Sequence, residues 1–187
     1  LNNNPKPLFV YNIDELLDRK DAEYKYEKVL CQGPEFTKCL VYFKEKDRRR
    51  LIEIREFDTE EGKFITDGFH ILPANSQAFW RNKNSIYVTT NLKNPYAWAN
   101  KVRVLKRGQS IEDAKVLYET DKYDVRLGLF ERGNHLFLSK DYRYLNSVYY
   151  LVKDDKLQLL NLPKDLKNLH VVSGQLIVQL KSEWTAK

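Results

Sequence analysis

The three histidines, His70, His135 and His170, are the side chains best suited to acid-base or metal chemistry near neutral pH. They stand far apart in the sequence, and neither a His-x-x-x-His nor a Cys-x-x-Cys spacing accompanies them. A histidine without such partners is most often a structural residue with a local hydrogen bond. We therefore predict three structural histidines and no metal site.

Serine nucleophiles of the α/β-hydrolase type need flanking glycines, as Gly-x-Ser-x-Gly, because their strained turn leaves little room for β-carbons. No serine of this chain has that pair; the serines are Ser76, Ser85, Ser110, Ser139, Ser147, Ser173 and Ser182. Gly-x-Gly does not occur either, which argues against a phosphate-binding loop. The acidic pairs Glu60-Glu61 and Asp154-Asp155 fall inside predicted turns, where solvated carboxylates support the turn. The sequence thus predicts no catalytic, cofactor-binding or metal-binding residue.

The two cysteines, Cys31 and Cys39, lie on either side of Gly33-Pro34. Two thiols are too few for a disulfide framework or a four-cysteine zinc site. Because free cysteines are usually buried and inert, we expect two reduced structural thiols. A local disulfide across a hairpin is the alternative.

Composition places the 187 residues among globular proteins of about one domain. No run approaches the roughly 18 apolar residues of a membrane-spanning helix, and the first residues lack a signal-peptide pattern, so we expect a cytoplasmic protein that binds no membrane. The net charge of +6 is spread along the chain, apart from Arg48-Arg49-Arg50, which we interpret as a solvated hairpin loop rather than a nucleic-acid site. The lack of any methionine suggests a piece of a longer protein.

Short strands dominate the pattern. Apolar and polar residues alternate around Ile52, Val102 and Leu176, which is typical of half-buried strands. Further apolar runs rich in β-branched and aromatic residues are found at 40–43, 86–90, 125–130, 135–138, 148–152 and 157–160. Only 13–18 and the segment after Ser110 look helical.

Turn residues separate these strands, at 58–62, 81–84, 131–134, 153–156 and 173–175. Three of the turns join an apolar pair to a new strand, and these hairpins recur at intervals of roughly 40 to 50 residues. Such a recurrence, with about four strands per period, is typical of β-propeller blades. The pattern therefore predicts an all-β chain of four-stranded antiparallel blades, with a β-sandwich as the alternative.

Several longer motifs then follow one another in a specific order: 55–65 (Arg-Glu-Phe-Asp-Thr-Glu-Glu-Gly-Lys-Phe-Ile), 67–76, Phe79-Trp80, 86–90, Lys106-Arg107-Gly108 and Ser182-Glu183-Trp184. Upstream of them stand 12–16 (Asn-Ile-Asp-Glu-Leu) and Cys39-Leu40. In order and spacing this series resembles the propeller region of prolyl oligopeptidase family serine peptidases. The loop 94–100 departs from the family pattern, which puts in doubt any contact that relatives make there.

The resemblance implies a parent enzyme with a seven-bladed propeller beside an α/β-hydrolase domain that carries the whole catalytic triad. Residues 1–187 would form about three blades plus parts of their neighbours, with the hydrolase domain absent from this chain. The parent would hydrolyse short proline-containing peptides without a cofactor, and the propeller would restrict access to the active site. The partners would be the hydrolase domain of the same parent chain and short peptides.

Two expectations concern the chain by itself. A partial propeller exposes unpaired strand edges, so we expect either self-association through the terminal blades or closure into a smaller arrangement. The alternative function is a free-standing β-propeller or sandwich that binds a protein partner, with Trp80, Tyr96 and Trp98 as candidate aromatic anchors.

Overall fold

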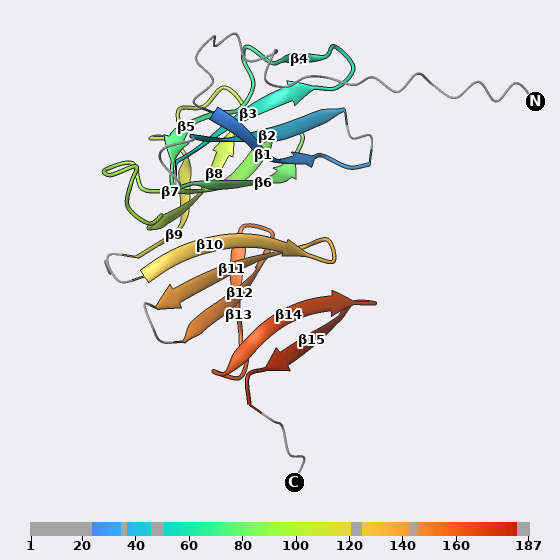
Figure 1. Ribbon diagram of the computed structural model, residues 1–187, viewed down its shortest axis with the longest axis vertical. Helices are drawn as coiled ribbons and strands as arrows, with labels where there is room; N and C mark the ends of the chain where they lie inside the picture. The colour runs from blue at the N-terminus through green and yellow to red at the C-terminus, as the bar shows by residue number, and fades with distance from the viewer. Residues whose placement is uncertain (1–23, 35–36, 46–50, 121–124, 143–145, 183–187) are drawn as a thin grey trace, which may run out of the picture.

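The computed structural model describes residues 24–34, 37–45, 51–120, 125–142 and 146–182. These residues form fifteen β-strands and no helix, arranged as a succession of antiparallel sheets along the long axis of the molecule (Figure 1). The predicted helix at 13–18 and the loop Arg48–Arg50 lie outside the described residues.

The first sheet contains β1 to β5, with bounds Tyr24–Cys31, Lys38–Glu45, Ile52–Asp58, Lys63–Phe64 and His70–Ala74. Its order is β1-β2-β3, and the fourth position beside β3 is shared. The short strand β4 pairs with the Phe57–Asp58 end of β3, whereas β5 pairs with the part of β3 that contains Ile52, Ile54 and Arg55. The sheet is thus a four-position blade whose outermost strand is interrupted.

Two regular four-stranded sheets follow, each with its strands in chain order. The second sheet has β6 Gln77–Asn82, β7 Ser85–Thr90, β8 Lys101–Lys106 and β9 Lys115–Glu119. The third has β10 Val125–Arg132, β11 His135–Tyr142, β12 Ser147–Lys153 and β13 Lys156–Leu160. The last sheet has two described strands, β14 Leu166–Val172 and β15 Gln175–Leu180. The described residues therefore make three blades and the first half of a fourth.

Tight turns fix the register of the hairpins. Gly133-Asn134, Asp154-Asp155 and Ser173-Gly174 each have positive φ at both residues, as two-residue hairpin turns with the twist of the flanking strands require. The turns β10–β11 and β14–β15 lie on the same side of the molecule, on the right in Figure 1. Because the strands of each blade alternate in direction, the β7–β8 loop lies at the opposite end.

The first strands of successive blades lie against one another. β10 contacts β6 and β7 of the preceding blade and β14 of the following one. The side-chain Oε1 of Gln77 in β6 accepts a 2.8 Å hydrogen bond from the backbone nitrogen of Leu129 in β10. This arrangement, with one strand of each sheet next to its neighbours, is that of propeller blades around a common axis.

Apolar side chains fill each junction between blades. One cluster joins the first and second sheets, through Leu40 and Ile54 on one side and Ile86 and Val88 on the other. Equivalent clusters join the second sheet to the third and the third to the fourth, so burial of apolar surface holds the blades together.

Tyr42 adds a polar link to the first junction. Its hydroxyl is buried, donates to the carbonyl of Ala78 in β6, and accepts a 3.0 Å hydrogen bond from the backbone nitrogen of the same residue. Burial raises the pKa of this phenol, although the hydrogen bond to Ala78 opposes the shift.

The fold predicted from the sequence is confirmed: the chain is all-β and consists of four-stranded antiparallel propeller blades that do not close into a ring. The predicted helix after Ser110 is wrong. Only four residues, 111–114, separate Ser110 from β9, and they form bends. Two of their backbone carbonyls accept hydrogen bonds from side chains outside this segment. The guanidinium of Arg103 donates to the carbonyl of Ala114, and the side-chain amide of Gln109 donates to the carbonyl of Asp113.

Candidate functional site

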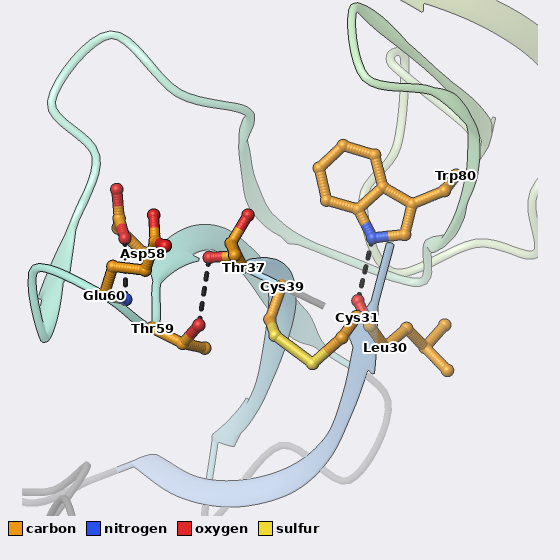
Figure 2. The surroundings of a disulfide bond; sticks show 8 residues. All are labelled: Leu30, Cys31, Thr37, Cys39, Asp58, Thr59, Glu60 and Trp80. Atoms are coloured by element: carbon orange, nitrogen blue, oxygen red, sulfur yellow. Dashed lines mark hydrogen bonds between the residues drawn. A yellow bond between two sulfur atoms is a disulfide. The ribbon is translucent and has the colours of Figure 1, made fainter. Parts of the chain in front are cut away.

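Cys31 and Cys39 form a disulfide, so the expectation of two reduced thiols is wrong (Figure 2). The reason is register: Cys31 at the end of β1 lies directly opposite Cys39 at the start of β2. Two further bonds hold the same corner. The indole nitrogen of Trp80 donates to the carbonyl of Leu30 at 2.8 Å, and the hydroxyl of Thr59 donates to the carbonyl of Thr37 at 3.2 Å.

All three histidines lie in strands. His70 in β5 places Nε2 2.8 Å from Oε1 of the buried Glu53. His135 in β11 places Nδ1 2.7 Å from the carbonyl oxygen of Gly133. His170 lies exposed in β14, opposite Ile177.

Ser139 and Ser85 use their hydroxyls in hydrogen bonds to neighbouring side chains, whereas the buried hydroxyl of Ser76 has no hydrogen-bond partner among the described residues. Ser139 donates to Oδ2 of Asp141 at 3.1 Å, and Ser85 donates to Oδ1 of Asn82 at 2.9 Å. No serine of the described ranges forms a hydrogen bond with a histidine, and none of the described residues gather into a group that could hold a metal ion. Within the described part of the chain, there is no helix that is long and apolar enough to cross a membrane.

The turn carboxylate of Asp155 has a larger role than the sequence suggested. It sits at the β12–β13 turn and reaches the preceding blade, where Nε of Arg81 lies 2.7 Å from Oδ1 and Tyr87 donates to the same oxygen at 3.1 Å. Lys115 lies 3.7 Å from Oδ2. Burial works to raise the pKa of Asp155, but the hydrogen bonds from Arg81 and Tyr87 outweigh burial and hold that pKa below its usual range.

The first and second blades share a comparable contact between Arg107 and Glu56. The guanidinium of Arg107 donates to both carboxylate oxygens of Glu56, at 2.8 and 2.7 Å. Glu56 is buried and also accepts a 2.9 Å hydrogen bond from the backbone nitrogen of Phe69. Such bidentate pairs combine charge with fixed geometry, so they set how adjacent blades sit together.

An apolar cavity of about 650 Å³ lies between β5 of the first blade and the second blade. Its lining includes Leu72 and Leu92, which are 69% and 44% exposed, together with Ile111 and Pro95. These apolar side chains make it a surface for contact with other apolar groups, although Asp67, His70 and Glu112 also line it.

A second cavity, of about 350 Å³, lies where the first three blades meet; we call it the junction cavity. Its lining includes Glu27 and Lys44 from β1 and β2, Trp98 from the β7–β8 loop, and Arg126 from β10. It lies at the end of the blades opposite the β10–β11 turn, because Lys44 lies near the end of β2 and Arg126 near the start of β10.

The charges of the junction cavity are incompletely paired. Lys44 lies 3.7 Å from Glu27, with both side chains partly exposed, so this attraction is weak. Arg126 is exposed and has no ion-pair partner among the described residues. Asp141 stands opposite Arg126 in the ladder, but its Oδ2 accepts the hydroxyl of Ser139. The cavity therefore combines two cations and one acid with the indole of Trp98.

The three candidate aromatic anchors have different surroundings. Trp80 is packed, with its ring at 5.8 Å from that of Phe69 and its nitrogen bonded to Leu30. Tyr96 is 53% exposed. Trp98 is partly buried in the junction cavity, where its carbonyl accepts a 3.0 Å hydrogen bond from the side chain of Asn91. Of the three, Trp98 is the one that lines this cavity.

Comparison with known proteins identifies relatives that are longer than this chain. An uncharacterized peptidase of Sinorhizobium fredii is 28% identical over 203 residues, which cover 98% of this chain and 27% of that protein. No family model matches the chain.

Solved structures show the same fold. A post-proline cleaving enzyme from Rickettsia typhi superposes with a TM-score of 0.74 at 23% identity, over 86% of this chain and 26% of that one. Oligopeptidase B from Leishmania major superposes with a TM-score of 0.65 at 12% identity, over 91% of this chain and 26% of that one. This chain spans about a quarter of the length of the relatives it matches. The resemblance found in the sequence is thereby confirmed: the chain is similar, as one segment, to peptidases of the prolyl oligopeptidase type.

Proposed function

We propose that this chain is the non-catalytic propeller portion of a prolyl oligopeptidase-like serine peptidase that hydrolyses short proline-containing peptides. The observation that carries the proposal is the combined match: nearly the whole chain aligns with one quarter of a protein named as a peptidase, and its blades superpose on a post-proline cleaving enzyme. The catalytic serine, aspartate and histidine would belong to an α/β-hydrolase domain of the same parent chain, in the cytoplasm.

The role of the propeller in this proposal is to restrict which substrates reach the active site. Rigid blades support that role, because the junctions are closed by apolar clusters and by the bidentate pair of Arg107 with Glu56. A rigid ring of blades would admit short peptides and exclude folded proteins.

The first test is the coding sequence on both sides of residues 1–187. The proposal expects Gly-x-Ser-x-Gly downstream, followed by an aspartate and a histidine. A reading frame that ended close to Lys187 would overturn it.

The second test is enzymatic. The full-length parent should cleave a chromogenic proline peptide, whereas it should leave a folded protein that carries the same sequence in a surface loop intact. The chain of residues 1–187 alone should cleave neither. Activity of that chain alone, or equal cleavage of both substrates by the parent, would contradict the proposal.

A further inference from the structure

The junction cavity is the place in the described structure where unpaired positive charge, an aromatic ring and a suitable volume occur together. At about 350 Å³ it can hold two or three residues of a peptide. Because three blades contribute to it, its shape depends on the arrangement of the blades and not on one loop.

Charge decides what kind of group fits. Among the described residues of the lining, Lys44 and Arg126 are cations and Glu27 is the one acid, so these residues together carry a net positive charge. Lys44 is held only loosely by Glu27, at 3.7 Å, and the exposed Arg126 has no ion-pair partner in the described part of the chain. A guanidinium in this state is suited to a carboxylate, with which it forms two parallel hydrogen bonds.

The remaining walls suit the part of a peptide next to a carboxylate. Trp98, Ile52 and Leu127 supply apolar surface. The polar wall is already ordered: Thr89 accepts a 2.9 Å hydrogen bond from the backbone nitrogen of Gln77, and Gln77 accepts one from Leu129. A preordered wall lowers the entropy that binding would cost.

We propose that the junction cavity binds a carboxylate of a short peptide, with Arg126 and Lys44 as the cationic partners and Trp98 as the apolar contact. The choice of a peptide as ligand rests on the proposed function and deepens it, because this site would give the parent enzyme a preference for acidic peptides. The carboxylate comes either from the C-terminus of the peptide or from an acidic side chain, and the chemistry of recognition is the same.

Three N-acetylated peptides separate these two sources in a titration of the 187-residue chain followed by NMR. They are acetyl-Ala-Pro-Ala-Ala with a free C-terminus, the same peptide as its amide, and acetyl-Glu-Pro-Ala-Ala amide. We expect at least one of the two charged peptides to bind about 10-fold more tightly than the neutral amide, and the tighter one identifies the source of the carboxylate. Raising the salt concentration should weaken the binding of this peptide more than the binding of the neutral amide. Equal affinity for all three would overturn the proposal.

Variants test the assignment to individual residues. R126Q should lower the affinity for the preferred peptide to the affinity for the neutral amide. K44Q should also lower the affinity for the preferred peptide, but by a smaller factor. The matched control is R132Q on the same strand, because Arg132 is exposed at the opposite end of β10. W98A should lower the affinity of the chain for all three peptides. Loss of the charge preference in R132Q, or its survival in R126Q, would contradict the site.

The outcome is separable from that of the proposed function. A parent enzyme that cleaves proline peptides, combined with no charge preference in the cavity, would overturn the inference alone. Carboxylate binding that depends on Arg126, in a parent without a catalytic triad, would support the site while the proposed function fails.

Discussion

Arg107 and Glu56 join two blades through a pair of hydrogen bonds to a carboxylate that is 1% exposed. Burial makes such a carboxylate costly without its partner, because a buried charge has lost its hydration. The guanidinium is itself one third exposed, which lessens the cost by letting water enter when the arginine is removed. The relationship therefore leads to a stability prediction that is specific to this junction.

We expect R107A to lower the free energy of unfolding by about 2–3 kcal/mol, at the low end for breaking a buried ion pair. Urea denaturation at pH 7 would measure it. The control is K63A, which breaks the exposed contact of Lys63 with Glu61 and should cost less than about 0.5 kcal/mol. Equal effects of the two substitutions would contradict the prediction.

The contact between Arg81 and Asp155 should depend on pH. The pKa of Asp155 is below its usual value in the folded chain, so the carboxylate contributes stability above about pH 4 and loses it as the pH falls further. We expect a double-mutant cycle of R81Q and D155N to give a coupling of about 1 kcal/mol at pH 7, shrinking steadily below pH 4. A coupling that stays constant down to pH 2 would show that the carboxylate is not responsible.

The disulfide between Cys31 and Cys39 should stabilise the first blade. Closing a loop of this length removes chain entropy from the unfolded state worth about 2–3 kcal/mol. The double variant C31S/C39S should lose about that amount in thermal or urea unfolding. A thiol reductant should destabilise the natural chain by a similar amount and leave the double variant unchanged; a reductant effect of equal size on both would rule out the bond as its cause.

Gly133 and Gly108 provide a matched pair for the junction of the third and fourth blades. Both have positive φ, but a β-carbon at Gly133 would lie 2.9 Å from Cβ of Val171, whereas nothing lies within 4 Å at Gly108. G108A should cost about 1 kcal/mol from backbone strain alone. G133A should lower the free energy of unfolding clearly more than G108A does, because the new β-carbon would also force Val171 and its strand β14 to move. Similar unfolding midpoints for the two variants would contradict this close approach.

The half-blade should drive the self-association expected of the isolated chain. β15 has one paired edge in the described structure, and Val172 and Ile177 on this hairpin are 53% and 50% exposed. We expect sedimentation analysis to show oligomers at about 10–100 μM and I177K to restore the monomer, since a lysine blocks edge pairing. V116K, on the outer strand of the second blade, is the control, because Val116 is also exposed but does not lie on a terminal blade. A natural chain that stays monomeric throughout would refute the prediction.

Local chemistry explains what the sequence could predict. The turns at Gly133-Asn134, Asp154-Asp155 and Ser173-Gly174 use residues that accept positive φ, so the hairpins around them could be recognised without tertiary information. β1 was not predicted, because its edge position leaves half of its residues exposed and none of them buried, which removes the apolar alternation. The outer strand β9 follows a segment mistaken for a helix, whose carbonyls are held by Arg103.

Features that depend on distant segments could not be predicted in this way. The disulfide required the register of β1 against β2, which a spacing of eight residues leaves open. The link from Asp155 to Arg81 required the packing of one blade on another. The junction cavity brings together Lys44, Trp98 and Arg126 from three separate stretches, and none of them belongs to a motif that marks a binding site.

Every strand in the described sheets pairs with a strand close to it in the chain, and this has a consequence for how the protein is made. A ribosome releases the chain from its N-terminus, so each blade can complete its hydrogen bonds soon after its last strand emerges. The short loops that must close also favour rapid formation of each sheet. The half-blade β14–β15 is then the last of the described sheets to form, and its apolar residues pack against a third blade that is already complete.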